Sequence, residues 1–241
     1  MVSDQGMIIA RRSVALSKTY LVIGTAMTFV GLFFTSLSSL VGNATVSGIS
    51  GGTNATSVVN TAAGVPFLAV PFQALSALLF STPVLLLFVY DKNNGVLEYL
   101  LSLGMNQRDI FRQYLKAALI LADAIVVLDV IIDVTVGLIE GDAIFALGIS
   151  GLVAAVALPA VSFGTMLMMS FSSLQKQRVG SNQPLGMAVG TSVVLPSYFL
   201  PLLVPSTAFR VDLILAATIV GLALLTYSVS GRLISREKLL P

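Results

Sequence analysis

Apolar residues fall in six long runs along the chain, and short polar segments separate them. An α-helix needs about 20 apolar residues to cross about 30 Å of hydrocarbon, and each run is close to that length or longer. The runs are 19–41, 66–90, 117–138, 143–171, 187–204 and 213–229. In the fifth run, we expect Pro196 and Pro201 to bend or break the helix. The pattern predicts an all-α integral membrane protein with six transmembrane helices.

Composition also indicates a membrane protein, and it excludes several types of catalytic and metal-binding site. Hydrophobic residues make up 56% of the chain and charged residues 10%, whereas soluble domains carry about 25% charged residues. The chain contains no Cys, His or Trp. This excludes disulfides, thiol nucleophiles, His-based triads and Cys/His zinc sites. A formal charge of +2 does not favour a nucleic-acid partner, so membrane lipid is the expected surroundings.

Lys and Arg are unevenly divided between the polar segments. Twelve of the 13 lie before the first run, between the second and third, between the fourth and fifth, or after the sixth, and only Arg210 lies elsewhere. Cytoplasmic segments of membrane proteins are enriched in Lys and Arg, so both termini are predicted to be cytoplasmic. In this single transmembrane domain, 1–241, residues 1–18 and 91–116 are then cytoplasmic and 42–65 form an outer loop. We expect a multi-pass protein of the plasma membrane.

The predicted outer loop contains two glycosylation sequons, at Asn43 and Asn54. Residues 42–64 carry no charge and are rich in Gly, Ser, Thr and Asn, as is typical of an exposed loop. Because the sequon is short, chance occurrence and glycosylation both stay open as explanations.

The cytoplasmic segment 91–116 contains a short stretch that is almost entirely apolar. We predict a helix from about Gly95 to Leu103, capped by Asn93 or Asn94 and stopped by Gly104, with a second helix starting at Asn106. Within the first helix, only Glu98 and Ser102 are polar. Such a helix has to be covered by the lipid interface, by the chain's own membrane helices or by a partner protein.

The residues of this segment resemble the link between the second and third spans of type-2 ATP-binding-cassette (ABC) transporter permeases. The matching positions are Asp91-Lys92, Gly95, Leu97-Glu98, Leu100-Leu101, Arg108-Asp109-Ile110 and Lys116. In that family the segment forms a coupling helix that sits in a groove of the ATPase subunit. The resemblance also implies that residues 7–18 of this chain form an elbow along the inner surface of the membrane. The family usually has a Pro shortly after the Leu pair, where this chain has Gly104.

The resemblance implies that ATP is hydrolysed by other chains. No G-x-x-x-x-G-K-[ST] phosphate-binding motif occurs in this sequence. We therefore expect no enzymatic activity and no cofactor in this chain, with ATP and Mg²⁺ bound by two copies of a partner ATPase. A second permease chain, identical or different, would complete the complex.

Three acidic residues interrupt the third apolar run, namely Asp123, Asp129 and Asp133. A charged side chain at the centre of a lipid-facing helix costs about 2.5–3.5 kcal/mol, so we expect all three to turn inward. Asp129 and Asp133 share one helix face, and Asp123 lies well away from it. The expected partners are hydroxyls such as those of Ser162, Thr165, Thr191 or Ser197. Interhelical hydrogen bonding, a substrate-facing cavity and proton coupling are the roles left open.

Two functions are compatible with these features. The first is the membrane-spanning subunit of an ABC exporter, which works as a permease dimer coupled to ATPase subunits through residues 95–103. The alternative is a polytopic membrane scaffold or assembly factor that transports nothing. The sequence does not identify a substrate.

Overall fold

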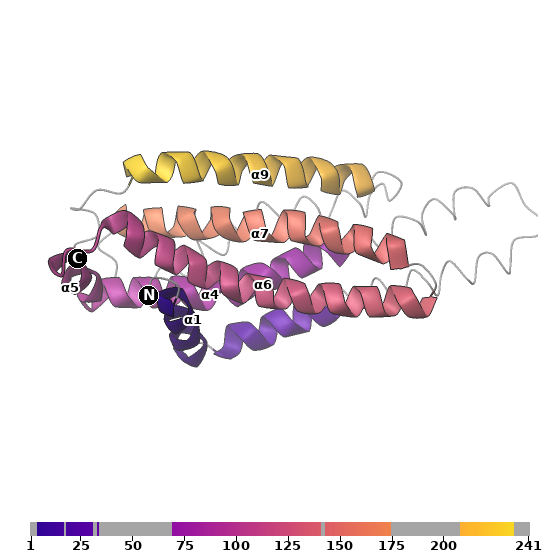
Figure 1. Cartoon of the computed structure of the whole chain (residues 1–241), viewed down its shortest axis with the longest axis horizontal. Coiled ribbons are helices and arrows are strands. Elements are labelled where there is room, and N and C mark those ends of the chain that lie inside the picture. Colours follow the sequence, from indigo (N-terminus) through magenta and orange to yellow (C-terminus); the bar gives the residue numbers. More distant parts are fainter. Residues whose placement is uncertain are drawn as a thin grey trace, which may run out of the picture.

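The computed structural model describes residues 4–16, 18–30, 33, 69–140, 143–174 and 208–233, to which the structural statements below refer. These residues form helices and no strand, as Figure 1 shows. The helices are α1 (Asp4–Leu16), α4 (Ala69–Asn93), α5 (Val96–Ser102), α6 (Gln107–Glu140), α7 (Ala143–Leu174) and α9 (Ala208–Leu233), with a further helical segment at residues 18–30. The predicted all-α fold is confirmed for this part of the chain.

Two helices are long and apolar enough to cross a membrane. They are Phe72–Asn93 within α4 and Leu147–Leu167 within α7, and a third span arises if Gly6–Ala15 and Lys18–Val30 count as one bent span. This indicates a membrane protein. The predicted count of six spans and the orientation of the termini stay predictions, and the fifth run, 187–204, lies outside the described residues.

Helix α4 lies at the centre of the bundle and contacts α1, α5, α6 and α7. Its apolar residues are spread around the whole helix, and its buried side chains include Ala77, Val84 and Phe88. A helix that is apolar on every side favours a central position. Helix α9 packs mainly on α7 and lies at the edge of the bundle (Figure 1).

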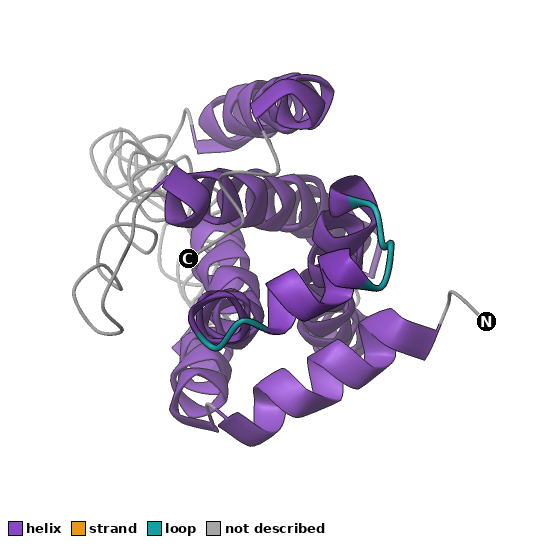
Figure 2. Cartoon of the chain, turned by 90° about the vertical axis from the view of Figure 1, so that its left-hand side faces the viewer, coloured by secondary structure: helices purple, strands orange, loops and turns teal. Residues whose placement is uncertain are grey.

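Helix α1 crosses the flank of the bundle instead of running along it (Figure 2). The axis of Gly6–Ala15 makes an angle of 93° with that of Lys18–Val30. Its buried face consists of Gly6, Ala10 and Ser13, and it packs on α4 and α6. The spacing of these small residues, three and four apart, is that of one helix face. Helix α1 thus lies across the bundle, and the elbow at the inner membrane surface stays a prediction.

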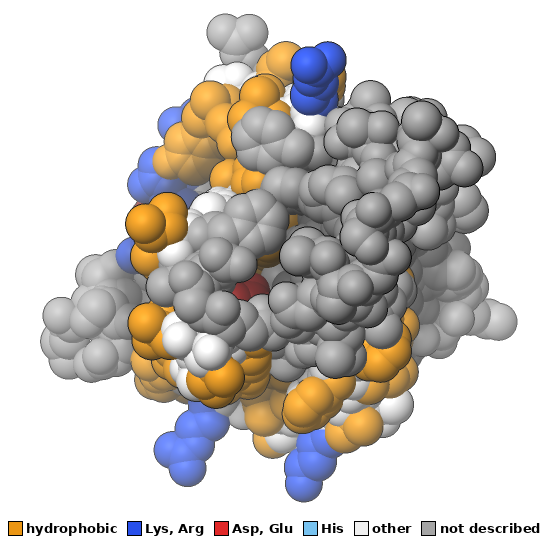
Figure 3. All heavy atoms as spheres, turned by 90° about the vertical axis from the view of Figure 1, so that its right-hand side faces the viewer, with side chains coloured by type: hydrophobic (Ala, Val, Ile, Leu, Met, Phe, Trp, Pro, Cys, Tyr) orange, Lys and Arg blue, Asp and Glu red, His pale blue; other side chains and the backbone are white. Residues whose placement is uncertain are grey.

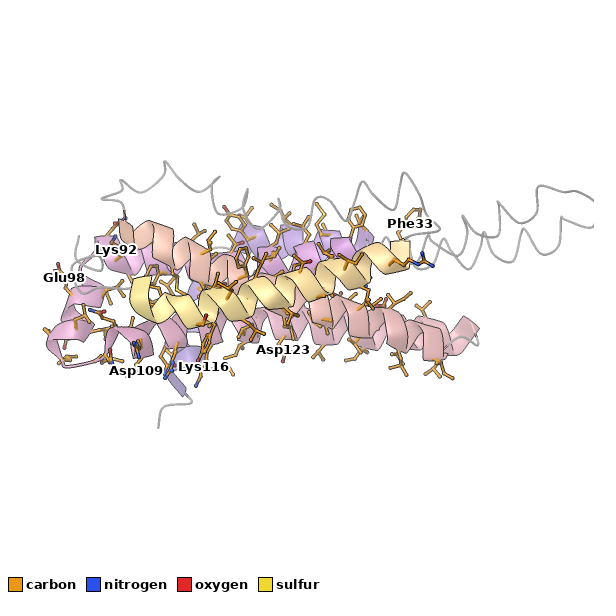
Figure 4. All side chains as sticks on the ribbon, turned by 90° about the horizontal axis from the view of Figure 1, so that it is seen from above. Phe33, Lys92, Glu98, Asp109, Lys116 and Asp123 are labelled. Atoms are coloured by element: carbon orange, nitrogen blue, oxygen red, sulfur yellow. The ribbon has the colours of Figure 1, made fainter. Side chains whose placement is uncertain are left out.

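The short helix α5 lies at one end of the bundle, where it joins the end of α4 to the start of α6 (Figures 1 and 2). Charged side chains gather at this end. Figure 4 places Lys92, Glu98, Asp109 and Lys116 there and Phe33 towards the opposite end. The segment 91–116 is therefore a compact helix–turn–helix at the charged end of an apolar bundle.

Candidate functional site

Two glycines set the limits of α5. Gly95 precedes it with φ 72° and Gly104 follows it with φ 82°, both in the left-handed region that glycine adopts without strain. The amides of Gly104 and Met105 donate to the carbonyl oxygens of Leu101 (3.1 Å) and Leu100 (3.2 Å), which is a Schellman motif. The predicted stop at Gly104 is confirmed.

The predicted start of α5 is wrong in one detail. No side chain caps its first turn. Asn93 or Asn94 was expected to do so, but the Asn94 side-chain amide donates to the carbonyl oxygen of Tyr90 (2.9 Å) and so closes α4. The left-handed conformation of Gly95 makes the turn between the two helices, which removes the need for a side-chain cap.

The leucines of α5 face the bundle. Leu97 is completely buried, and Leu100 and Leu101 are partly buried against the core. The outer face consists of Glu98, Tyr99, Ser102 and Leu103, of which Tyr99 is 63% and Leu103 62% exposed. The expectation that Leu97 forms part of a docking surface is therefore wrong, because the chain's own helices cover it. Leu97 anchors α5, and the outer face is what a partner can reach.

A buried carboxylate at the end of α4, directly before α5, connects this region to α1. Asp91, at the end of α4, accepts a 2.6 Å hydrogen bond from the Tyr114 hydroxyl of α6. Arg12 of α1 lies beside it, with 3.1 Å between Arg12 Nη2 and Asp91 Oδ1. The Asp91 side chain is 2% exposed and that of Arg12 is 50% exposed. Three helices thus meet at one carboxylate, which we call the Asp91 cluster (Arg12, Asp91 and Tyr114).

Aromatic packing holds Tyr114 in place within the Asp91 cluster. The ring of Phe88 contacts those of Tyr114 and Phe111 edge-on, with centroids 5.1 and 5.3 Å apart. Burial, and then the hydrogen bond to Asp91 and its negative charge, raise the pKa of Tyr114 well above its usual value. The phenol therefore stays neutral and donates to Asp91 throughout the physiological pH range.

Arg108 and Asp109, the remaining coupling candidates, lie in the first turn of α6 and are exposed. Asn106 begins this helix as predicted, since its side-chain oxygen accepts from the Arg108 amide (3.4 Å) and its carbonyl from the Asp109 amide (2.9 Å). Asp109 pairs loosely with Arg112 at 3.9 Å. Figure 4 shows Asp109 at the same end as α5, and the neighbouring Arg108 is also exposed, so this turn contributes charge near α5.

Of the three acids in the third apolar run, which lies within α6, the structure buries two. Asp129 is completely buried and Asp133 is 4% exposed, as expected for two residues that share an inward face. Asp133 accepts hydrogen bonds from the Gln73 amide nitrogen of α4 (3.1 and 3.3 Å) and the Ser150 hydroxyl of α7 (3.5 Å). The expected role in interhelical hydrogen bonding is therefore present at Asp133.

The prediction of hydroxyl partners for the acids is wrong for Ser162 and Thr165, the two that the structure describes. Ser162 donates to the carbonyl of Leu158, and the Thr165 hydroxyl makes no hydrogen bond within the described part of the chain. Thr191 and Ser197 lie outside the described residues. Gln73 was missed, although it is the single amide side chain in the second apolar run and so was a visible signal.

Asp123 does not turn inward as predicted. It is exposed on the outer surface of α6, next to the exposed apolar residues Val127 and Leu128, and Figure 4 shows it on the flank of the bundle. The helical rotation that buries Asp129 and Asp133 forces Asp123 outward, because six residues turn the helix by 600°. Asn43 and Asn54, the candidate glycosylation sites, lie outside the described residues.

Comparison of this chain with protein-family models, with curated proteins and with solved structures finds no match.

Proposed function

We propose that this chain is the membrane-spanning subunit of an ABC exporter, with six transmembrane helices and both termini in the cytoplasm. A permease dimer forms the substrate pathway, and two ATPase subunits dock at the cytoplasmic end. The outer face of α5 (Glu98, Tyr99, Ser102 and Leu103) is the docking surface. The resemblance in segment 91–116 supports this proposal, and the division of α5 into an anchored face and an exposed face is the observation that carries it.

The exposed residues of α5 have the character of a docking surface. Tyr99 and Leu103 are large, four residues apart on one helix face, and more than half exposed. Aromatic side chains are enriched among the residues that dominate binding at interfaces. Glu98 is also exposed, and a charge at the rim of such a surface tunes the rate and specificity of association more than the affinity.

The Asp91 cluster supports a role in force transmission. A displacement of α5 is transmitted to α4 and α6, because Leu97 is buried in the core that both helices share. Asp91 extends this connection to α1 through Arg12. Through Leu97 and the Arg12–Asp91 ion pair, α5 and α1 are linked at the end where the ATPase is proposed to bind.

Exchanging Tyr99 for Asp tests this function. We expect Tyr99→Asp to lower recovery of the ATPase subunit with the affinity-tagged chain at least tenfold and to abolish stimulated ATP hydrolysis, because a charge in a desolvated contact costs about 2 kcal/mol or more. The measurement compares ATPase recovery and ATP turnover of variant and parent in the same detergent.

Leu97→Ala is the matched control on the same helix. It removes a buried side chain, so it lowers the melting temperature of the chain while leaving the outer face of α5 in place. The folded fraction of Leu97→Ala is then expected to bind the ATPase. Undiminished ATPase recovery and turnover with Tyr99→Asp would contradict the docking assignment.

A further inference from the structure

Polar side chains from four helices converge on the two buried acids of α6. Gln73 of α4 and Ser150 of α7 donate to Asp133. One turn earlier on α6, Asp129 lies beside Thr28 of the 18–30 helix. The hydroxyls of Thr28 and Ser76 of α4 are 2.8 Å apart. We call this set the inner polar cluster (Thr28, Gln73, Ser76, Asp129, Asp133 and Ser150).

Every member of the inner polar cluster is at least 96% buried. Asp129, Gln73 and Ser76 are completely buried, and Thr28 is 1% exposed. Gln73 and Ser150 belong to the two candidate membrane spans. The cluster therefore lies inside the apolar bundle, where bulk water does not solvate a charge.

The side-chain atoms of the cluster that lack a partner are all acceptors. Within the described part of the chain, neither carboxylate oxygen of Asp129 meets a donor in good hydrogen-bond geometry, although the Thr28 hydroxyl lies close to it, and Oε1 of Gln73 has no partner. The Gln73 amide nitrogen is already used by Asp133. Unpaired acceptors around a buried carboxylate are costly unless a positive charge lies among them.

The surrounding helices supply no such charge. None of the six apolar runs contains Lys or Arg. In the described structure, α4, α7 and the 18–30 helix contribute only neutral side chains to the cluster. A proton or a cation from outside the chain can neutralise the carboxylate. Carboxylate, amide and hydroxyl oxygens are hard ligands that bind hard cations.

We propose that Asp129, Gln73 Oε1 and the hydroxyls of Thr28 and Ser76 bind a monovalent metal cation such as Na⁺. Asp133 already accepts hydrogen bonds from Gln73 and Ser150. Within the described part of the chain, Asp129 has no comparable set of donors and no positively charged partner, and a single monovalent cation balances its charge. This site goes beyond the proposed function and does not depend on it, because every ligand belongs to this chain.

The cluster lies nearer the end of the bundle opposite α5. Figure 3, seen from that end, shows acidic side-chain atoms near the middle of the face. Asp129 and Asp133 lie in the second half of α6, on the side away from α5. We expect the cation to enter from there.

Thermal unfolding of the purified chain in detergent tests the site. Circular dichroism follows the unfolding, since the chain has no Trp for fluorescence. NaCl replaces choline chloride at constant ionic strength and pH 7. We expect the melting temperature to rise by about 3–6 °C for each tenfold increase in Na⁺ above its dissociation constant. Asp129→Asn abolishes this dependence, and Asp123→Asn, at an exposed position of the same helix, retains it.

A second variant covers the case in which Asp129→Asn fails to fold. Ser76→Ala removes one hydroxyl ligand and shifts the response to at least threefold higher Na⁺. A melting temperature that changes with pH but not with Na⁺ would show that the acids bind protons only, and would overturn the proposal. So would a melting temperature independent of both, or a Na⁺ response that survives in Asp129→Asn.

Discussion

Asp91 is a single buried carboxylate that joins three helices. Tyr114 donates to it at 2.6 Å and Arg12 lies 3.1 Å away. Hydrogen bonds to charged groups contribute more to stability than neutral ones, about 1.5–3 kcal/mol each. The half-exposed guanidinium of Arg12 adds less, because solvent screens its charge. Tyr114 is therefore expected to be the stronger stabilising partner.

Tyr114→Phe tests this difference. We expect the free energy of unfolding to fall by about 1.5–3 kcal/mol, since the buried carboxylate loses its neutral donor. Unfolding in mixed SDS micelles, followed by circular dichroism, measures the change. Tyr99→Phe is the control because the ring of Tyr99 is largely exposed, and its unfolding free energy is expected to stay within about 0.5 kcal/mol of the parent. Equal losses in both variants would contradict the role of Asp91.

At the scale of elements, the contact between the 18–30 helix and α4 depends on one glycine. Gly24 is buried, and a Cβ atom there would lie 2.7 Å from Cε2 of Phe80 and 3.4 Å from the Ser76 carbonyl oxygen. This close approach brings Thr28, one turn later, within 2.8 Å of Ser76. Gly24 therefore also determines the geometry of the inner polar cluster.

Gly24→Ala is expected to destabilise the chain by about 1–3 kcal/mol, because the added methyl group overpacks the contact with Phe80. Gly148→Ala in α7 is the matched control. A Cβ atom at Gly148 meets nothing within 4 Å in the described structure, so its unfolding free energy stays the same or rises slightly. The measurement compares the unfolding free energies of both variants with that of the parent chain. An unchanged or higher value for Gly24→Ala would show that the helices do not meet as described.

The sequence predicts the elements better than their contacts. The apolar runs gave the helices around α4, α6, α7 and α9, and Gly104 and Asn106 gave the turn between α5 and α6. The orientation of α5 was not predictable, because a helix that is apolar nearly all round has no distinct inner face and Leu97 and Leu103 look alike. The ion pair between Arg12 and Asp91 was not predictable from the sequence, because the two residues are 79 positions apart.

At the scale of the whole molecule, apolar side chains remain exposed along the flanks of the bundle. Examples are Phe29 in the 18–30 helix, Ile131 in α6 and Leu224 in α9. Lipid tails or another protein chain cover such surfaces in a membrane. By contrast, the end that carries α5 is charged (Figure 4). The molecule therefore has an apolar flank suited to the bilayer and one end suited to a soluble partner.

Site-specific cross-linking to the ATPase subunit tests the central claim most directly. The chain has no Cys, so a single Leu103→Cys substitution introduces one thiol without background. The chain is co-expressed with a Walker-motif ABC ATPase, and the membranes are treated with a thiol–amine cross-linker. The matched control is Ile131→Cys, which exposes a thiol on the flank of α6. We predict that Leu103→Cys yields a cross-linked product with the ATPase subunit and Ile131→Cys does not. Labelling of Leu103→Cys by an impermeant maleimide in intact cells, without any ATPase adduct, would contradict the account.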